Sequence, residues 1–75
     1  MEPLPFDALA YEIAQTLNDP DALPLYKTYV EKYEHDFLRR TLRNVMSVPS
    51  HKIRRTRGAL FTFLVMNNGK SHIRA

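Results

Sequence analysis

The chain has 75 residues, which is enough for one domain and too few for a second hydrophobic core. It contains no cysteine, which excludes disulfides and thiolate metal sites, and its longest apolar stretch, residues 59–66, is far too short to cross a bilayer. The first five residues have neither the basic start nor the apolar run of a signal peptide, so we expect a cytoplasmic protein with no membrane association.

The net charge of +3 conceals a strong segregation of charge along the chain. All eight acidic residues lie within residues 1–36, where two lysines oppose them and leave a net charge of −6. Residues 37–75 contain nine Lys and Arg residues and no acid, a charge of +9. Such a split suggests a polyanionic partner for the second half, and the alternative is that the two halves neutralise each other within the fold.

The hydrophobic periodicity predicts an all-α fold, a small irregular bundle of about four helices. Residues 5–17 place their apolar side chains on one helical stripe, with proline tolerated in the first turn. A second helix is expected over about residues 21–33, and Pro24 must lie in its first turn because a deeper proline would break it. Asp36 is the expected N-cap of a third helix whose apolar positions fall within residues 37–46.

The last segment has two interpretations. Residues 53–67 fit a buried helix that Thr56 could cap, because the central residues are apolar on all sides. The same residues suit a strand, and Asn-Gly at 68–69 is a hairpin signal, so residues 60–66 could pair with residues 70–75 in an α+β fold. We favour the helix, because an isolated hairpin is marginally stable and no other segment offers a sheet partner.

With the helix, residues 1–67 form a single domain and residues 68–75 a flexible tail. The predicted core combines apolar residues from all four helices. They are Leu9, Ile13, Leu17, Tyr26, Val30, Leu38, Leu42, Val45, Leu60, Phe61 and Leu64.

No group of residues in the sequence predicts catalysis. His35, His51 and His72 lie in separate loop or tail contexts and lack the helical pairing of metal and acid–base motifs. The acids of residues 31–36 are more typical of a solvated surface, and two glycines are too few for a phosphate-cradling loop. We therefore expect no enzyme activity, no cofactor, no metal and no small-molecule substrate.

Two basic clusters supply the candidate nucleic-acid-binding residues, and six of their seven side chains are arginine, whose planar fork fits phosphate well. The first cluster is Arg39, Arg40 and Arg43, and the second is Lys52, Arg54, Arg55 and Arg57. The alternative interpretation makes them a solvated rim that pairs with the acids of the second helix.

Gly58 and three tyrosines also allow two interpretations each. If Thr56 caps the fourth helix, the free N–H groups of its first turn could hold a phosphate that Gly58 lets approach closely, or Gly58 could instead serve helix packing. Tyr26, Tyr29 and Tyr33 share one helix face, which we assign to the core rather than to a base-stacking platform.

The run Phe37-Leu38-Arg39-Arg40-Thr41-Leu42-Arg43, followed by the run from Ile53 to Val65, resembles the C-terminal helical module of DnaD-like bacterial replication-initiation proteins. In that family a helix, a basic connector and an aromatic-aliphatic helix follow one another. The chain lacks the tryptophan that often closes the family's last helix. The resemblance implies nucleic-acid association through Arg54, Arg55, Arg57 and the last helix.

The sequence thus predicts a non-catalytic module that contacts the phosphates of DNA or RNA with little sequence readout. The alternative is a protein-interaction module that binds an acidic protein, or a homo-oligomer in which the acidic half of one copy meets the basic half of another.

Overall fold

The computed structural model describes the backbone of residues 5–74 and the side chains of residues 8–74, and this range is all-α, as predicted. Four α-helices and three short 3-10 helices follow one another along the chain. They are α1 (Pro5–Thr16), η1 (Pro20–Ala22), α2 (Leu23–Lys32), α3 (His35–Ser47), η2 (Ser50–Lys52), α4 (Arg57–Asn68) and η3 (Gly69–His72). The hairpin alternative is wrong, because residues 60–66 lie inside α4. No helix in the described range is long and apolar enough to span a bilayer.

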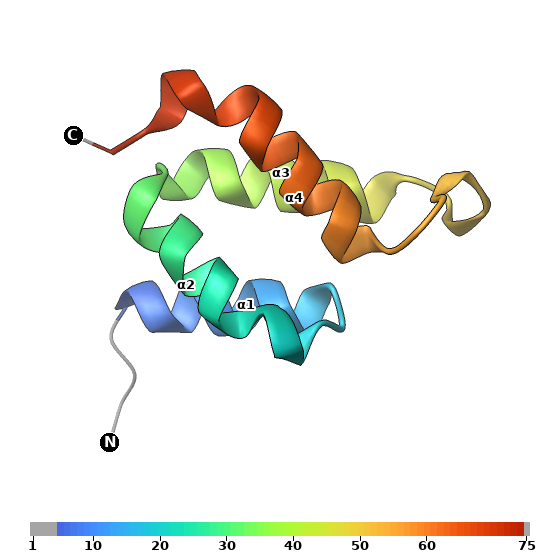
Figure 1. Ribbon diagram of the computed structural model, residues 1–75, viewed down its shortest axis with the longest axis horizontal. Helices are drawn as coiled ribbons and strands as arrows, with labels where there is room; N and C mark the ends of the chain where they lie inside the picture. Colours follow the sequence, from blue (N-terminus) through green and yellow to red (C-terminus); the bar gives the residue numbers. More distant parts are fainter. Residues whose placement is uncertain (1–4, 75) are drawn as a thin grey trace.

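The helices form a bundle of two packed pairs (Figure 1). One pair is α1 with α2 and the other is α3 with α4. The loop that joins α3 to α4 projects at one end of the molecule, and the C-terminal segment lies at the opposite end. This loop contains η2 and the basic residues before α4, so the fold places Lys52, Arg54 and Arg55 at an exposed tip.

Local signals at the helix ends account for most of the boundaries. Pro24 lies in the first turn of α2, and Thr56 caps α4 by accepting a hydrogen bond from the Ala59 N–H at 3.0 Å; both predictions are confirmed. The predicted cap at Asp36 is wrong, because α3 begins earlier and Glu34 occupies the N-cap position. The earlier start follows from the extended backbone at Tyr33 and Glu34, which ends α2 and leaves Asp36 inside the first turn.

The core contains nine of the eleven predicted residues, while Leu60 and Leu64 are only half-buried against it. A continuous series of rings runs through it, as the core assignment of the tyrosines predicts, with neighbouring centroids 4.4–6.4 Å apart. In order these rings are Phe61, Tyr26, Tyr29, Tyr33, Phe37 and His72. Aromatic pairs of this kind connect α4, α2 and α3.

The C-terminal segment packs against the domain instead of extending from it as the predicted tail of residues 68–75. Its backbone runs antiparallel to the connection between α2 and α3. The Glu34 N–H donates to the His72 carbonyl at 2.7 Å, and the Arg74 N–H donates to the Lys32 carbonyl at 2.9 Å. These hydrogen bonds to a distant part of the chain order the C-terminal segment, and residue composition alone does not indicate them. Ala75 lies outside the described residues.

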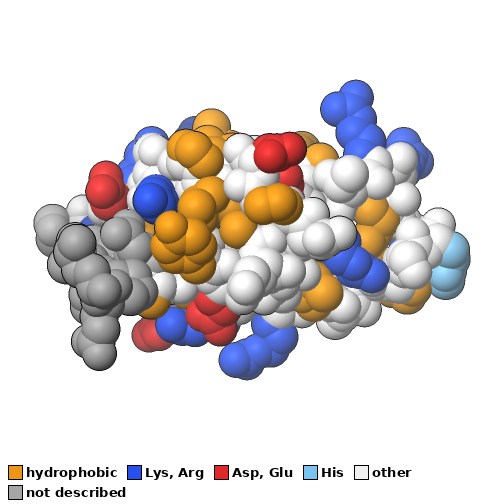
Figure 2. All heavy atoms as spheres, turned by 90° about the horizontal axis from the view of Figure 1, so that it is seen from below, with side chains coloured by type: hydrophobic (Ala, Val, Ile, Leu, Met, Phe, Trp, Pro, Cys, Tyr) orange, Lys and Arg blue, Asp and Glu red, His pale blue; other side chains and the backbone are white. Residues whose placement is uncertain are grey.

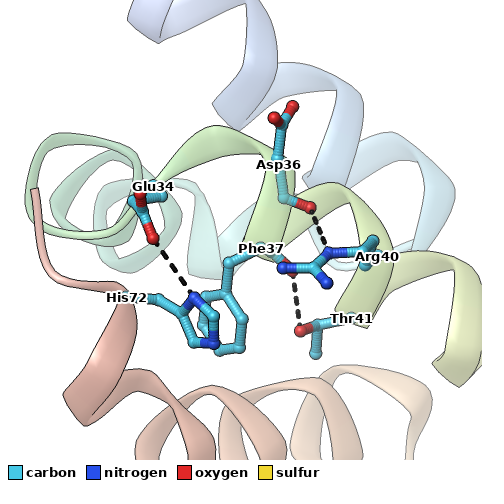
Figure 3. Close-up of polar contacts among 6 residues, drawn as sticks. All are labelled: Glu34, Asp36, Phe37, Arg40, Thr41 and His72. Carbon is cyan, nitrogen blue, oxygen red and sulfur yellow. Dashed lines mark hydrogen bonds and ion pairs between the residues drawn. The ribbon is translucent and has the colours of Figure 1, made fainter.

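The His72 side chain strengthens this attachment (Figure 3). Its ring stacks on Phe37 with centroids 4.4 Å apart and an interplanar angle of 4°, and its Nδ1 lies 3.2 Å from Glu34 Oε1. Beneath this contact the buried Thr41 hydroxyl donates to the Phe37 carbonyl at 2.8 Å. One histidine of the sequence analysis is therefore a packing residue of the C-terminal segment.

Candidate functional site

Residues 52–56, which we call the basic turn, contain three exposed cations. The side chains of Lys52, Arg54 and Arg55 are all exposed, whereas Ile53 is half-buried. None of these three cations forms a hydrogen bond or ion pair with another residue in the described range. Their charges are therefore available to a partner.

The surface around this end of the molecule is rich in positive charge (Figure 2). On the face that Figure 2 shows, Lys and Arg side chains are scattered over the whole length, and at the right end, where the loop between α3 and α4 lies in Figure 1, they appear with a His side chain and no visible Asp or Glu. The Asp and Glu side chains visible on this face lie toward the middle and the other end. An anion approaching the tip from this side thus meets cations first.

An open groove lies between the basic turn and the outer side of α4. Residues of the turn line one wall and α4 lines the other. The lining residues are Lys52, Ile53, Arg54, Arg55, Thr56, Ala59, Leu60 and Phe63. The groove therefore combines three cations with an apolar wall and contains no carboxylate.

Arg57 differs from the other cations of its cluster because its guanidinium is bound inside the fold. Its Nη1 donates to the carbonyls of Val45 and Val48, at 2.7 and 2.8 Å. Both carbonyls belong to the C-terminal end of α3, where a cation also interacts favourably with the helix dipole. The structure thus gives Arg57 the role of joining α4 to the end of α3.

The first turn of α4 also faces inward. Gly58 is buried, and a Cβ at this position would lie 2.6 Å from Asp19 Oδ2 and 3.0 Å from the Tyr26 hydroxyl oxygen. Gly58 therefore permits close packing of α4 on the connection after α1, which is the second of its two interpretations. Since the carboxylate of Asp19 lies beside this helix end, a negative charge of the protein itself already stabilises it.

The first basic cluster lies elsewhere, on α3. The Arg39 guanidinium pairs with Glu12 of α1 at 2.8 Å, with both side chains about half exposed, and the Arg40 Nε donates to the Asp36 carbonyl at 3.4 Å. Arg43 is exposed in a separate hollow between α1 and α3. The structure does not bring this cluster into the groove at the basic turn.

The three histidines lie apart from one another in the structure. His35 Nε2 lies 3.0 Å from the Val30 carbonyl, His51 is exposed in η2 and His72 packs at the C-terminal segment. The described residues contain no group of three or more His, Cys, Asp or Glu side chains placed to hold a metal ion.

Phe63 is the groove residue that the sequence analysis did not identify. Residues 59–66 were expected to be buried on all sides, and this is wrong: Phe63 is 62% exposed and Met66 is 56% exposed. Helical spacing explains the difference, since Phe61 and Val65 share the inner face while Phe63 lies two residues from each and points to the other side. Applying that spacing to the apolar run shows that Phe61 and Phe63 cannot both face the core, but it does not show which of the two is buried.

Comparisons with protein-family models, with curated protein sequences and with solved structures yield no match to this chain, so the resemblance to DnaD-like proteins stays a prediction.

Proposed function

We propose that this chain is a small non-catalytic helical module that binds nucleic-acid phosphates through its basic C-terminal half. The observation that carries the proposal is the exposure of Lys52, Arg54 and Arg55 together, without an internal partner among the described residues. Three cations within four residues, at a projecting end of the fold, match the repeated negative charge of a phosphate backbone.

The proposal narrows the set of contact residues within the two clusters. Arg54 and Arg55 bind phosphate directly, with Lys52 beside them, because their donors are free. Arg57 acts through the fold, since its Nη1 is bound to two carbonyls of the chain. Arg39, Arg40 and Arg43 add long-range attraction from a different surface.

Salt dependence tests this function. The protein is titrated into labelled single- and double-stranded oligonucleotides at low and moderate salt, and the Arg54→Gln/Arg55→Gln variant is compared with Arg39→Gln/Arg43→Gln as a control that removes the same charge. For a duplex the logarithm of the affinity falls with the logarithm of salt by about 0.9 per phosphate contact, so the first variant should flatten that slope by about 2. The control should change it less.

Two results contradict the proposal. One is an absence of binding at low salt for the unaltered protein, and the other is binding whose salt slope is the same in both double variants and in the unaltered protein. The first would show that the basic turn has no affinity for phosphate chains, and the second that binding depends on other residues.

A protein-interaction module is the second candidate, and the charge split of −6 and +9 is the observation that favours it. An acidic half on one copy that meets a basic half on another is a head-to-tail contact, which produces rings or open chains. Sedimentation of the purified protein checks self-association: a mass well above 8.8 kDa that falls as salt rises would support it, and a monomer at all salt concentrations would contradict it.

A further inference from the structure

Phe63 is an exposed aromatic side chain in the wall of the groove between the basic turn and α4. At 62% it has the largest exposed fraction of the large hydrophobic side chains in the described range. It lines the groove together with Arg54 and Arg55, and the shorter apolar side chains of Ala59 and Leu60 lie beside it. The groove thus offers a flat apolar surface next to two guanidinium groups.

The fold itself makes little use of this ring. The buried face of α4 is filled by Phe61 and Val65, and Phe61 has the ring contact with Tyr26. Within the described residues Phe63 has no aromatic partner, whereas the other ring of α4 belongs to the series in the core. A ligand that covers such an exposed apolar side chain removes a large apolar area from water, which favours binding.

We propose that the groove binds single-stranded nucleic acid, with one base stacked on Phe63 and the neighbouring phosphates on Arg54 and Arg55; this rests on the proposed function. Cations that follow a backbone, combined with an aromatic side chain that stacks an exposed base, are the combination that binds single strands without sequence preference. In a duplex the base faces are covered by their neighbours, so only the arginine contacts remain. The ring therefore selects for single strands, and the cations supply affinity for both forms.

The groove chemistry also argues for this occupant over an acidic protein segment. Every charged side chain that lines the groove is a cation, and a polynucleotide presents both phosphates for these cations and flat bases for the ring. An acidic peptide satisfies the cations only, because its carboxylates have no counterpart for the flat face of Phe63.

Removal of the Phe63 ring should affect the affinity for single strands and the affinity for duplexes differently. The affinities of the full chain for a labelled oligothymidylate and for a fully paired duplex are measured for the unaltered protein, for Phe63→Leu and for Tyr11→Leu, a control at an exposed aromatic residue on α1. Loss of one stacked base should weaken single-strand binding by about tenfold in Phe63→Leu and leave duplex binding nearly unchanged. Phe63→Tyr, which keeps a ring, should restore single-strand binding, and Tyr11→Leu should have no effect on either ligand.

A fluorescent ring reports the stacking directly. The chain has no tryptophan, so Phe63→Trp introduces a single one. Its emission should be quenched by oligothymidylate and much less by the duplex at equal occupancy. Circular dichroism confirms that each variant is folded before the affinities are compared.

The outcomes distinguish base stacking on Phe63 from the phosphate-binding function on which it rests. Equal loss of affinity for both ligands in Phe63→Leu, or no loss for either while binding persists, would overturn the stacking inference and leave the phosphate-binding function standing. An absence of binding to both ligands by the unaltered protein would overturn both, and binding of an oligoglutamate peptide in that case would assign the groove to an acidic protein segment.

Discussion

The Tyr26 hydroxyl donates a hydrogen bond to the Asp19 carboxylate at 3.1 Å, and both groups lie against Gly58 at the start of α4. Tyr26 belongs to α2 and Asp19 to the connection that precedes it. The three residues therefore join the α1–α2 pair to the α3–α4 pair at a point where no side chain larger than hydrogen fits on α4. Stability of the contact between the pairs should depend on this point.

A methyl group at Gly58 should destabilise the protein. In Gly58→Ala the new Cβ would meet Asp19 Oδ2 at 2.6 Å, so a shift of packed groups that costs about 1–3 kcal/mol outweighs the gain of up to about 1 kcal/mol in helix propensity. Urea denaturation measures the change. In an Asp19→Ala background the same substitution should cost less by about 1 kcal/mol, because the nearest atom is gone. An equal loss of stability in both backgrounds would show that the contact with Asp19 does not cause the destabilisation.

The Tyr26 hydroxyl should make stability fall at alkaline pH. Burial, followed by the hydrogen bond to Asp19, raises the pKa of Tyr26 far above its usual value. The unfolded chain loses this proton at about pH 10, whereas the folded protein keeps it up to its own higher pKa. Between these two pH values the folded state binds more protons than the unfolded state. The free energy of unfolding therefore decreases by up to about 1.4 kcal/mol for each unit of pH increase. Tyr26→Phe should remove this part of the pH dependence. Tyr11→Phe, at the surface, serves as the control and should retain it.

Neutralising Arg57 should destabilise the fold, whereas neutralising its neighbour should not. Arg57→Met leaves the Val45 and Val48 carbonyls without their shared donor, and the loss of hydrogen bonds from a charged group costs about 1.5–3 kcal/mol. Arg55→Met removes the same charge from an exposed side chain and should change stability by less than about 0.5 kcal/mol. Thermal denaturation of the two variants tests the difference, and equal stabilities would contradict the joining role of Arg57.

Gly69→Ala should detach the C-terminal segment. A Cβ at Gly69 would overlap the Tyr33 ring, so the start of η3 must move away from the connection between α2 and α3. Amide hydrogen exchange should then show lost protection at Glu34 and Arg74, whose N–H groups bond across this contact, with little change at Ile13 in α1. Ser71→Ala, an exposed position in the same 3-10 helix, is the matched control. Protection that persists in Gly69→Ala would show that the segment tolerates the displacement.

Sequence reasoning succeeds here where the signal is local. Pro24 fixes the first turn of α2, and the Thr56 hydroxyl fixes the start of α4, because each acts within a few residues of its own position. The stripes of apolar residues identify most of the core for the same reason, since helical spacing alone determines which side chains share a face.

Sequence reasoning fails where contacts join distant segments, or where a helix has apolar residues on all sides and the buried side cannot be distinguished from the exposed one. The stacking of His72 on Phe37 and the bonds from Arg57 to the end of α3 have no local signature, so residues 68–75 were expected to be a tail and Arg57 a surface cation. In α4 the eight successive residues 59–66 are nearly all apolar, which conceals the exposure of Phe63 until the packing partners of Phe61 are known.

The basic turn is fastened at both of its ends. At its start, the N–H groups of Lys52 and Ile53 close η2 through hydrogen bonds of 2.9 and 3.1 Å to the carbonyls of residues 49 and 50. At its end, Thr56 caps α4, and the next residue, Arg57, holds the end of α3. Only the backbone of residues 54 and 55 remains to be immobilised when a ligand binds, and fixing a backbone costs about 1–2 kcal/mol of conformational entropy per residue. The loop is thus preorganised, which lowers the backbone entropy cost of the phosphate binding that we propose.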